Sequence, residues 1–354
     1  MPYSRIGGEL EINPAYLKPG ETEFNPKGIL LASGRMALDV ILKYLSDNKK
    51  INEILYPGYL CDSLIGVAVN NNLKITFYQL DKYFHIDKAS FPKDLENKAV
   101  LLINYFGLID TSEDILFLKK NTSRCSIILD NVQAFFEMFS DTKADFVFAS
   151  IRKFFPVPDG GWLIANDREF KFEFNGTRPE LLFSKNKLLG GILKHYSNSE
   201  EMEDDIFQEF LEEGEDYLDN YQSIEIISRE ALCILSNINF EHTALQRIAN
   251  ANFVLENLQQ LNIRTLFPIA SVSSAPFAIP VKVKNRDKVW DKFADNKIYL
   301  LVHWPVAEYY KDRVKPGYDI SKEELSLIID QRYNQNDLSR MFEVLNSCKA
   351  EKLV

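Results

Sequence analysis

The feature that most constrains this chain is an alternation that runs from residue 28 to residue 165. Short apolar runs rich in β-branched residues, such as 99–104 and 126–129, are typical of buried strands. Between such runs lie segments whose apolar residues recur at helical spacing, including 36–45 and 111–120. Strands that alternate with helices form βαβ units, so we predict an α/β fold with a mostly parallel sheet.

Two of these predicted strands end on side chains that can take part in chemistry. The run 126–129 is followed by Asp130, and the run 145–149 is followed by Ser150 and then by Lys153. Because ligands of open parallel sheets bind outside the carboxyl ends of the strands, we expect the acid and the amine to share one site. Taken singly, each residue is better explained as a turn aspartate or a surface lysine, and it is the ordered set that favours a shared site.

An acid and an amine at one site fit the needs of pyridoxal phosphate (PLP). A lysine forms a Schiff base with the aldehyde of this cofactor, and an acidic residue keeps the pyridine nitrogen protonated so that the ring can accept electrons. We therefore expect PLP as the cofactor, with Lys153 and Asp130 as the catalytic residues.

The stretch from Ser126 to Gly161 also resembles the DegT/DnrJ/EryC1/StrS aminotransferases, a family of fold-type-I PLP enzymes. The resemblance implies a large PLP-binding domain with a mostly parallel sheet and a smaller C-terminal α+β domain. It also implies a role for each of four residues. The pyridine nitrogen would bind Asp130, the phenolic oxygen Gln133, the phosphate Ser150 and the aldehyde Lys153.

A second cofactor contact is expected where the first long helix begins. Ser33-Gly34-Arg35 forms a small-residue turn before the helical pattern 36–45. Free backbone N–H groups and the positive end of the helix dipole make such a turn an anion site. The family resemblance assigns the PLP phosphate to Ser33, Gly34 and Arg35. The alternative is an ordinary helix cap with an arginine that faces solvent.

The segment Pro57-Gly-Tyr-Leu-Cys61 is the candidate for contact with the face of the cofactor ring. Family members carry a comparable proline-containing turn whose aromatic side chain stacks on the pyridine, and Tyr59 is the matching aromatic residue here. A shift of the match by one or two residues would place Cys61 there instead. Read without the resemblance, Tyr59 is equally well a half-buried packing residue.

Length and composition limit the domain organisation and the class of protein. The 354 residues predict a large domain over 1–250, which includes an N-terminal arm, and a small domain over 251–354. Residues 230–261 show long helical periodicity and would link the two domains. A net charge of -10 argues against nucleic-acid binding. The four scattered cysteines and the lack of a long apolar run indicate a cytoplasmic protein without disulfides or a membrane partner.

Two further features of the sequence each allow a structural and a functional interpretation. Ten acidic residues and no basic ones lie between Glu200 and Asp216, which predicts a solvated helix, with a lid or a subunit contact as the alternative. His303-Trp304-Pro305 and Arg332 lie where fold-type-I enzymes often place substrate contacts, but they are also plausible packing residues. The histidines have no partners at ligand spacing, so we expect no metal site.

The resemblance implies an aminotransferase that passes an amino group from an amino acid such as glutamate to a nucleotide-linked keto-sugar. It also implies a homodimer with small-molecule substrates as its partners. The presence of Lys153 argues against the related sugar dehydratases, which carry a histidine in its place. A different PLP reaction on an amino acid, as in a lyase or aldolase, is one alternative. A binding protein without catalytic activity is the other.

Overall fold

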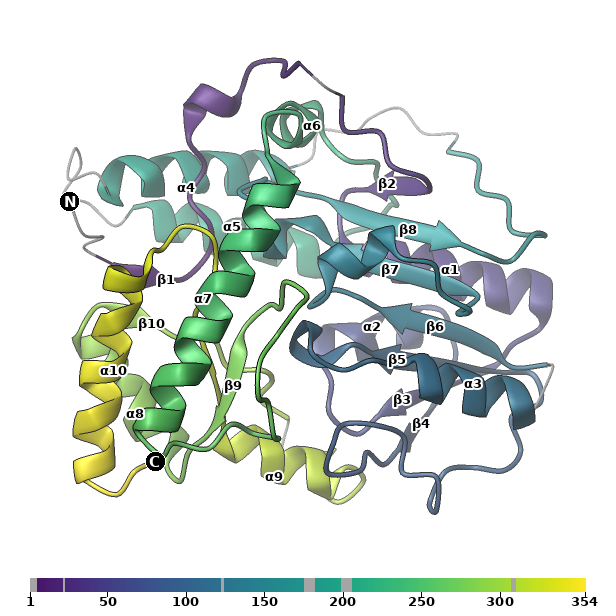
Figure 1. The fold of residues 1–354 in the computed structure, drawn as a ribbon. Coiled ribbons are helices and arrows are strands. Elements are labelled where there is room, and N and C mark those ends of the chain that lie inside the picture. The colour runs from purple at the N-terminus through teal and green to yellow at the C-terminus, as the bar shows by residue number, and fades with distance from the viewer. Residues whose placement is uncertain (1–4, 22, 122–123, 175–181, 199–205, 307–309) are drawn as a thin grey trace.

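A seven-stranded sheet forms the centre of the computed structural model, which describes residues 5–21, 23–121, 124–174, 182–198, 206–306 and 310–354. The spatial order of its strands is β2-β8-β7-β6-β5-β3-β4. Their bounds are β2 (Ile29–Leu31), β3 (Glu53–Pro57), β4 (Lys74–Tyr78), β5 (Lys98–Ile103), β6 (Ser126–Asp130), β7 (Phe146–Ser150) and β8 (Gly161–Ala165). Figure 1 shows this sheet to the right of the C-terminal helices.

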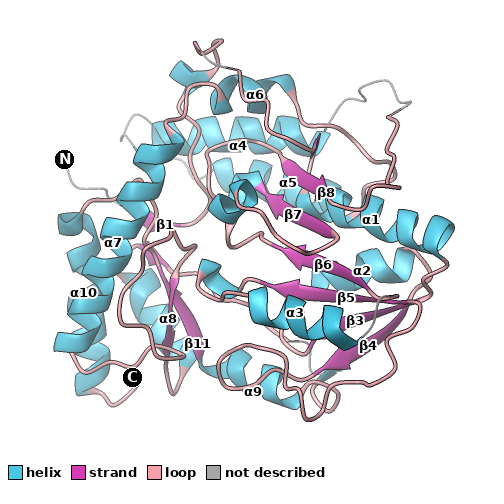
Figure 2. Ribbon diagram, turned by 45° about the vertical axis from the view of Figure 1, so that its right-hand side comes forward, coloured by secondary structure: helices cyan, strands magenta, loops and turns pink. Residues whose placement is uncertain are grey.

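The strands are parallel except for β8, which pairs antiparallel with both β7 and β2. The predicted mostly parallel sheet is therefore confirmed. Helices α1 (Gly34–Lys49) and α2 (Asp62–Asn70) lie on one face, and α3 (Ser112–Asn121) lies on the other, as Figure 2 shows. This layering follows from the βαβ connections, which place the helices on the faces of a parallel sheet.

Successive residues of each strand point to opposite faces, so the sheet separates two cores. On the α1 and α2 face the core contains Leu101, Ile128 and Phe146, with residues of both helices. On the α3 face it contains the alternate strand residues, such as Leu102 and Leu129. The position of a residue along its strand therefore decides which face its side chain reaches.

Four further helices lie between the last strand of the sheet and the C-terminal part: α4 (Leu182–Asn198), α5 (Phe207–Asp219), α6 (Arg229–Leu235) and α7 (Phe240–Gln260). The helical periodicity over 230–261 corresponds to two helices, because the chain leaves helical geometry between α6 and α7. Asn239 begins α7 by accepting a hydrogen bond from the backbone N–H of His242. An asparagine cap of this kind favours a new helix start over a continuous helix.

The C-terminal part has its own core. Strands β9 (Ile279–Lys282) and β11 (Glu324–Leu327) pair antiparallel, with α8 (Arg286–Asp295) and α10 (Gln335–Ala350) in the same core. Helix α9 (Lys315–Glu323) instead packs its Ile320 against the core on the α1 and α2 face of the large sheet. Strand β1 (Ile6–Gly7) pairs with β10 (Ile298–Tyr299), so the N-terminal segment crosses to this part, and Ile6 belongs to its core. The predicted boundary near residue 250 stays a prediction. Among the described residues, no helix combines the length and hydropathy needed to cross a membrane.

Candidate active site

A small cavity of about 100 Å³ lies at the carboxyl edge of the sheet, on the face covered by α1 and α2. It brings together seven of the eight predicted site residues. These are Ser33, Gly34, Arg35, Asp130, Gln133, Ser150 and Lys153. The other lining residues are Cys61, Ser63, Leu64, Ile103, Val132, Phe148, Arg152, Glu215, Leu218 and Trp304.

Strand register explains why these residues meet. Ile103 ends β5 and pairs with Asp130 at the end of β6, and Asp130 pairs with Phe148 near the end of β7. Ser150 lies two residues beyond Phe148, so its side chain points to the same face. The floor of the cavity is therefore the last set of side chains on one face of three adjacent parallel strands.

Asp130 is a buried carboxylate, and only 5% of the residue is exposed. Its Oδ1 accepts a hydrogen bond of 2.8 Å from the backbone N–H of Val132. Burial raises the pKa of Asp130 to about 7, and the Val132 bond offsets this only in part. A buried carboxylate of this kind is stabilised when a cation lies beside it.

Gln133 places an amide donor in the same cavity. Its Oε1 accepts a hydrogen bond of 2.7 Å from the backbone N–H of Phe106, in the 3-10 helix η2 (Tyr105–Gly107). That bond fixes the orientation of the amide, while the buried Nε2 has no hydrogen-bond partner. Since buried donors without a partner are rare, the Nε2 group is available for an acceptor atom of a ligand.

Lys153 ends the 3-10 helix η4 (Ile151–Lys153), which follows β7 directly. The residue lines the cavity and remains exposed to solvent. Enough protein surrounds the amine to lower its pKa, first through loss of hydration and then through the positive charge of Arg152. A lysine with a lowered pKa has a larger share of neutral amine, which is the nucleophilic form.

The start of α1, where an anion site is predicted, lines the cavity through Ser33, Gly34 and Arg35. Ser33 caps the helix by accepting a hydrogen bond of 3.1 Å from the N–H of Met36. The turn packs closely against β8, because a Cβ atom on Gly161 would lie 2.1 Å from the carbonyl oxygen of Ser33. Only glycine fits at position 161, and this close approach holds the first turn of α1 beside the cavity.

Arg35 does not face solvent. Its Nη2 donates to Glu215 of α5 at 2.8 Å, and its Nη1 donates to Asp219. Arg152 Nη2 reaches the same Glu215 oxygen at 3.0 Å, and Lys187 Nζ of α4 lies 3.0 Å from the other oxygen. Three cations thus meet around Glu215 at the wall of the cavity, with Asp219 as a second partner of Arg35 and Glu9 at 2.7 Å from Lys187 Nζ.

The structure does not bring Tyr59 to the cavity. Tyr59 is fully buried, and its ring packs against Tyr105 and Trp304, with ring centroids 5.9 Å and 5.5 Å away. Cys61, named as the alternative, does line the cavity, and so does the indole of Trp304. The packing interpretation of Tyr59 therefore fits the structure, and the aromatic residues that line the cavity are Phe148 and Trp304.

Of the remaining candidates, His303 lies next to the site and Arg332 does not line the cavity. His303 is buried, its Nδ1 lies 2.9 Å from Ser326 Oγ, and burial followed by the charge of Lys153 lowers its pKa to about 3. Arg332 pairs with Asp330 at 2.8 Å and with Glu11 at 2.7 Å. Arg332 therefore ties the N-terminal segment to the C-terminal part.

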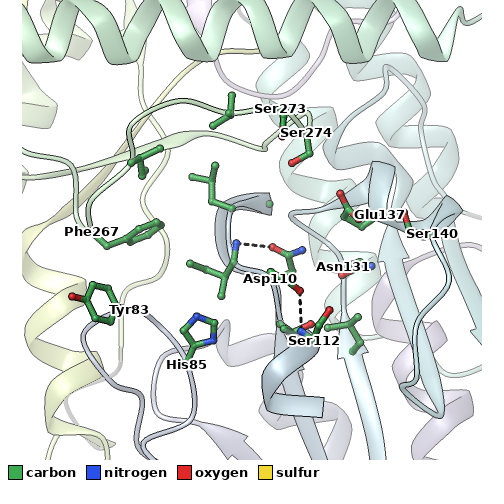
Figure 3. Close-up of a pocket in the computed structure, with 18 of the residues that line it drawn as sticks. Tyr83, His85, Asp110, Ser112, Asn131, Glu137, Ser140, Phe267, Ser273 and Ser274 are labelled. Atoms are coloured by element: carbon green, nitrogen blue, oxygen red, sulfur yellow. Dashed lines mark hydrogen bonds between the residues drawn. The ribbon is translucent and has the colours of Figure 1, made fainter. Parts of the chain in front are cut away.

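A larger cavity of about 870 Å³ lies beside the opposite face of the sheet, where Leu129 of the α3-face core lines it. Figure 3 shows its walls, which include Tyr83, His85, Asp110 and Phe267. None of the described residues that line it is a lysine or an arginine. This cavity thus lacks both an amine nucleophile and a cation for a phosphate, although it is the roomier one. Within the described part of the chain, no group of three His, Cys, Asp or Glu side chains could hold a metal ion.

Comparison with solved structures shows the same fold. The PLP form of Spr1654 from Streptococcus pneumoniae, assigned as a sugar aminotransferase, matches over 100% of both chains with a TM-score of 0.66 at 13% identity. The sugar aminotransferase CalS13 from Micromonospora echinospora matches over 96% of this chain and 93% of its own, with a TM-score of 0.61 at 15% identity. A DegT DnrJ EryC1 StrS aminotransferase from Brucella abortus covers 90% of this chain and 85% of its own, with a TM-score of 0.60 at 15% identity.

No protein-family model and no curated protein sequence matches this chain. The likeness at these low identities concerns the fold, and it confirms the predicted fold-type-I architecture. Sequence reasoning missed Arg152 and Glu215 as lining residues, whereas Trp304, named as a possible substrate contact, does line the cavity. The basic pair Arg152-Lys153 at a strand end was the one local signal, whereas Glu215 reaches Arg35 across 180 positions of sequence.

Proposed function

We propose that this protein is a PLP-dependent aminotransferase. The observation that carries the proposal is the set of groups around the small cavity: a buried carboxylate, an orphaned amide donor, an amine of lowered pKa and a helix N-terminus with arginines. These are the groups that the pyridine nitrogen, phenolic oxygen, aldehyde and phosphate of PLP require. The donor set fits the cofactor without any change of residue.

Each residue has a role that follows from its surroundings. PLP supplies an electron sink that stabilises a carbanion next to the substrate nitrogen. Asp130 would hold a proton on the pyridine nitrogen, and Gln133 would orient the ring through its Nε2. Ser33, Gly34, Arg35 and Ser150 would bind the phosphate. Lys153 would attach the cofactor and, once freed, move a proton as a general base.

The substrates are proposed from the solved structures that share the fold. Two of the three reported above carry names that state a sugar aminotransferase. We infer a keto-sugar, linked to a nucleotide, as the acceptor and an amino acid such as glutamate as the donor. A homodimer in the cytoplasm completes the proposal, and the four free cysteines agree with a reducing compartment.

A half-reaction tests the proposal. Purified protein loaded with PLP should convert to the pyridoxamine form when glutamate is added, and the change in absorbance of the bound cofactor should be reversed by 2-oxoglutarate. Lys153→Ala should retain the fold, as judged by circular dichroism, and should lose this conversion. If the protein binds PLP and cleaves the amino acid without forming the pyridoxamine form of the cofactor, the lyase or aldolase alternative is favoured. Failure to bind PLP at all would favour a binding protein without catalysis.

A further inference from the structure

Glu215 of α5 places a carboxylate inside the proposed phosphate region. One of its oxygens accepts hydrogen bonds from Arg35 at 2.8 Å and Arg152 at 3.0 Å, and the other lies 3.0 Å from Lys187 Nζ. These cations come from three separate elements, namely α1, η4 and α4. The Glu215 carboxylate is therefore held by the same kinds of contact that would hold a bound anion.

The cluster is shielded from solvent. The side chain of Lys187 is 3% exposed, that of Arg152 is 11% exposed and that of Glu215 is 34% exposed. Burial alone would raise the pKa of Glu215, but Arg152, Lys187, Lys153 and Arg35 outweigh it and lower the pKa. Glu215 is therefore an anion at neutral pH, and partly buried ion pairs of this kind are screened less by salt than surface pairs.

Arg35 lies in the first turn of α1, and it lines the small cavity together with Arg152. Arginine binds carboxylate and phosphate through the same planar fork of N–H donors, so the two anions compete for it. A phosphate that binds at Ser33 and Gly34 would lie beside Arg35 and Arg152, and the charge of Glu215 would repel it. Any contact that the phosphate gains from these cations is lost by Glu215.

We propose that Glu215 is an internal competitor of the cofactor phosphate, which must displace it from Arg35 and Arg152. This inference rests on the proposed function, and it makes α5 a determinant of cofactor affinity. When binding requires displacement of an internal ligand, the apparent affinity equals the intrinsic affinity multiplied by the fraction of molecules in which the site is free. Removal of the carboxylate should thus tighten the binding of phosphate-bearing ligands alone. A purely structural role for Glu215 predicts the opposite sign, because the cations would lose the partner that positions them.

The test compares the wild type with Glu215→Gln and with a matched control, Glu212→Gln. Glu212 lies one turn earlier on α5 and is exposed, so the control carries the same charge change away from the cluster. Apo protein is titrated with PLP and with pyridoxal, which lacks the phosphate. We expect Glu215→Gln to bind PLP about tenfold more tightly, with much less change for pyridoxal and none for the control. Unchanged or weaker PLP binding by Glu215→Gln would overturn the proposal.

A second measurement does not depend on PLP. Inorganic phosphate should raise the melting temperature of Glu215→Gln by more than that of the wild type, because Arg35, Arg152 and Lys187 have each lost one carboxylate partner. Equal shifts would count against the competition. If the wild type binds no PLP, the proposed function fails, while the phosphate measurement still decides the role of Glu215. If the glutamine variant folds poorly, both measurements are repeated on Glu215→Ala, which also removes the carboxylate.

Discussion

Replacement of Asp130 by asparagine should make the apo protein more stable while it impairs cofactor binding. Burial raises the pKa of Asp130 from an ordinary value of 3.8 to about 7. The folded state therefore holds this proton more tightly than the unfolded state does. At about 1.4 kcal/mol per pKa unit, the shift corresponds to a loss on the order of 4 kcal/mol of stability at high pH.

The sign of the pH dependence follows from the same shift. A carboxyl group whose pKa is raised on folding lowers the free energy of unfolding only slightly near pH 4. The loss of stability grows with pH until the pH passes the folded pKa near 7. Asparagine cannot ionise, so it avoids this cost. Between pH 5 and pH 8 we expect the difference in free energy of unfolding, Asp130→Asn minus wild type, to grow by about 2 to 3 kcal/mol in favour of the variant.

Urea unfolding of the apo proteins at the two pH values measures this difference directly. The control is Asp141→Asn, which removes an exposed carboxylate of the same chemical type and should show no such growth. The same preparations should differ in PLP affinity, because asparagine cannot hold a proton on the pyridine nitrogen as a carboxylate does. A difference in stability that is the same at both pH values, or a variant less stable at pH 8, would refute the reasoning.

Three other substitutions test single contacts by urea unfolding. Ser33→Ala removes the cap of α1 and should lower the free energy of unfolding by about 1 kcal/mol. Ser33→Thr should retain most of the stabilisation that the cap provides. Gln133→Leu leaves the N–H of Phe106 without an acceptor and should cost about 1 to 3 kcal/mol, with weaker PLP binding; no loss of stability would contradict that bond. Arg247→Leu should cost about 3 kcal/mol, because this fully buried guanidinium donates to two backbone carbonyls just before β9; a change within 0.5 kcal/mol would contradict its role.

The sequence was sufficient to predict the sheet and most of the cavity. Asp130 and Lys153 follow apolar runs in a strand-helix alternation, and the carboxyl ends of parallel strands share one edge of a sheet. That rule does not depend on the detailed conformation of any loop. Glycine and serine at the start of α1 are local signals of the same kind, since they cap the helix whatever lies beside it.

Predictions that depended on loop register or on distant contacts could not be made in the same way. A shift of one or two residues between Pro57 and Cys61 decides whether Tyr59 or Cys61 reaches the cavity, and composition does not fix that shift. Glu215 belongs to an acidic run that predicts a solvated helix. Its partners Arg35 and Arg152 lie far away in the sequence, so only the folded chain shows that the charge is paired inside a cavity.

The measurement that tests the central claim most directly is the mapping of the residue that carries the cofactor. The protein is incubated with PLP, reduced with borohydride and digested, and the modified peptide is identified by mass spectrometry. We expect one stoichiometric modification on Lys153, absent in Lys153→Ala. Modification at another lysine, or no stable modification of the wild type, would contradict the assignment of this cavity as a PLP site.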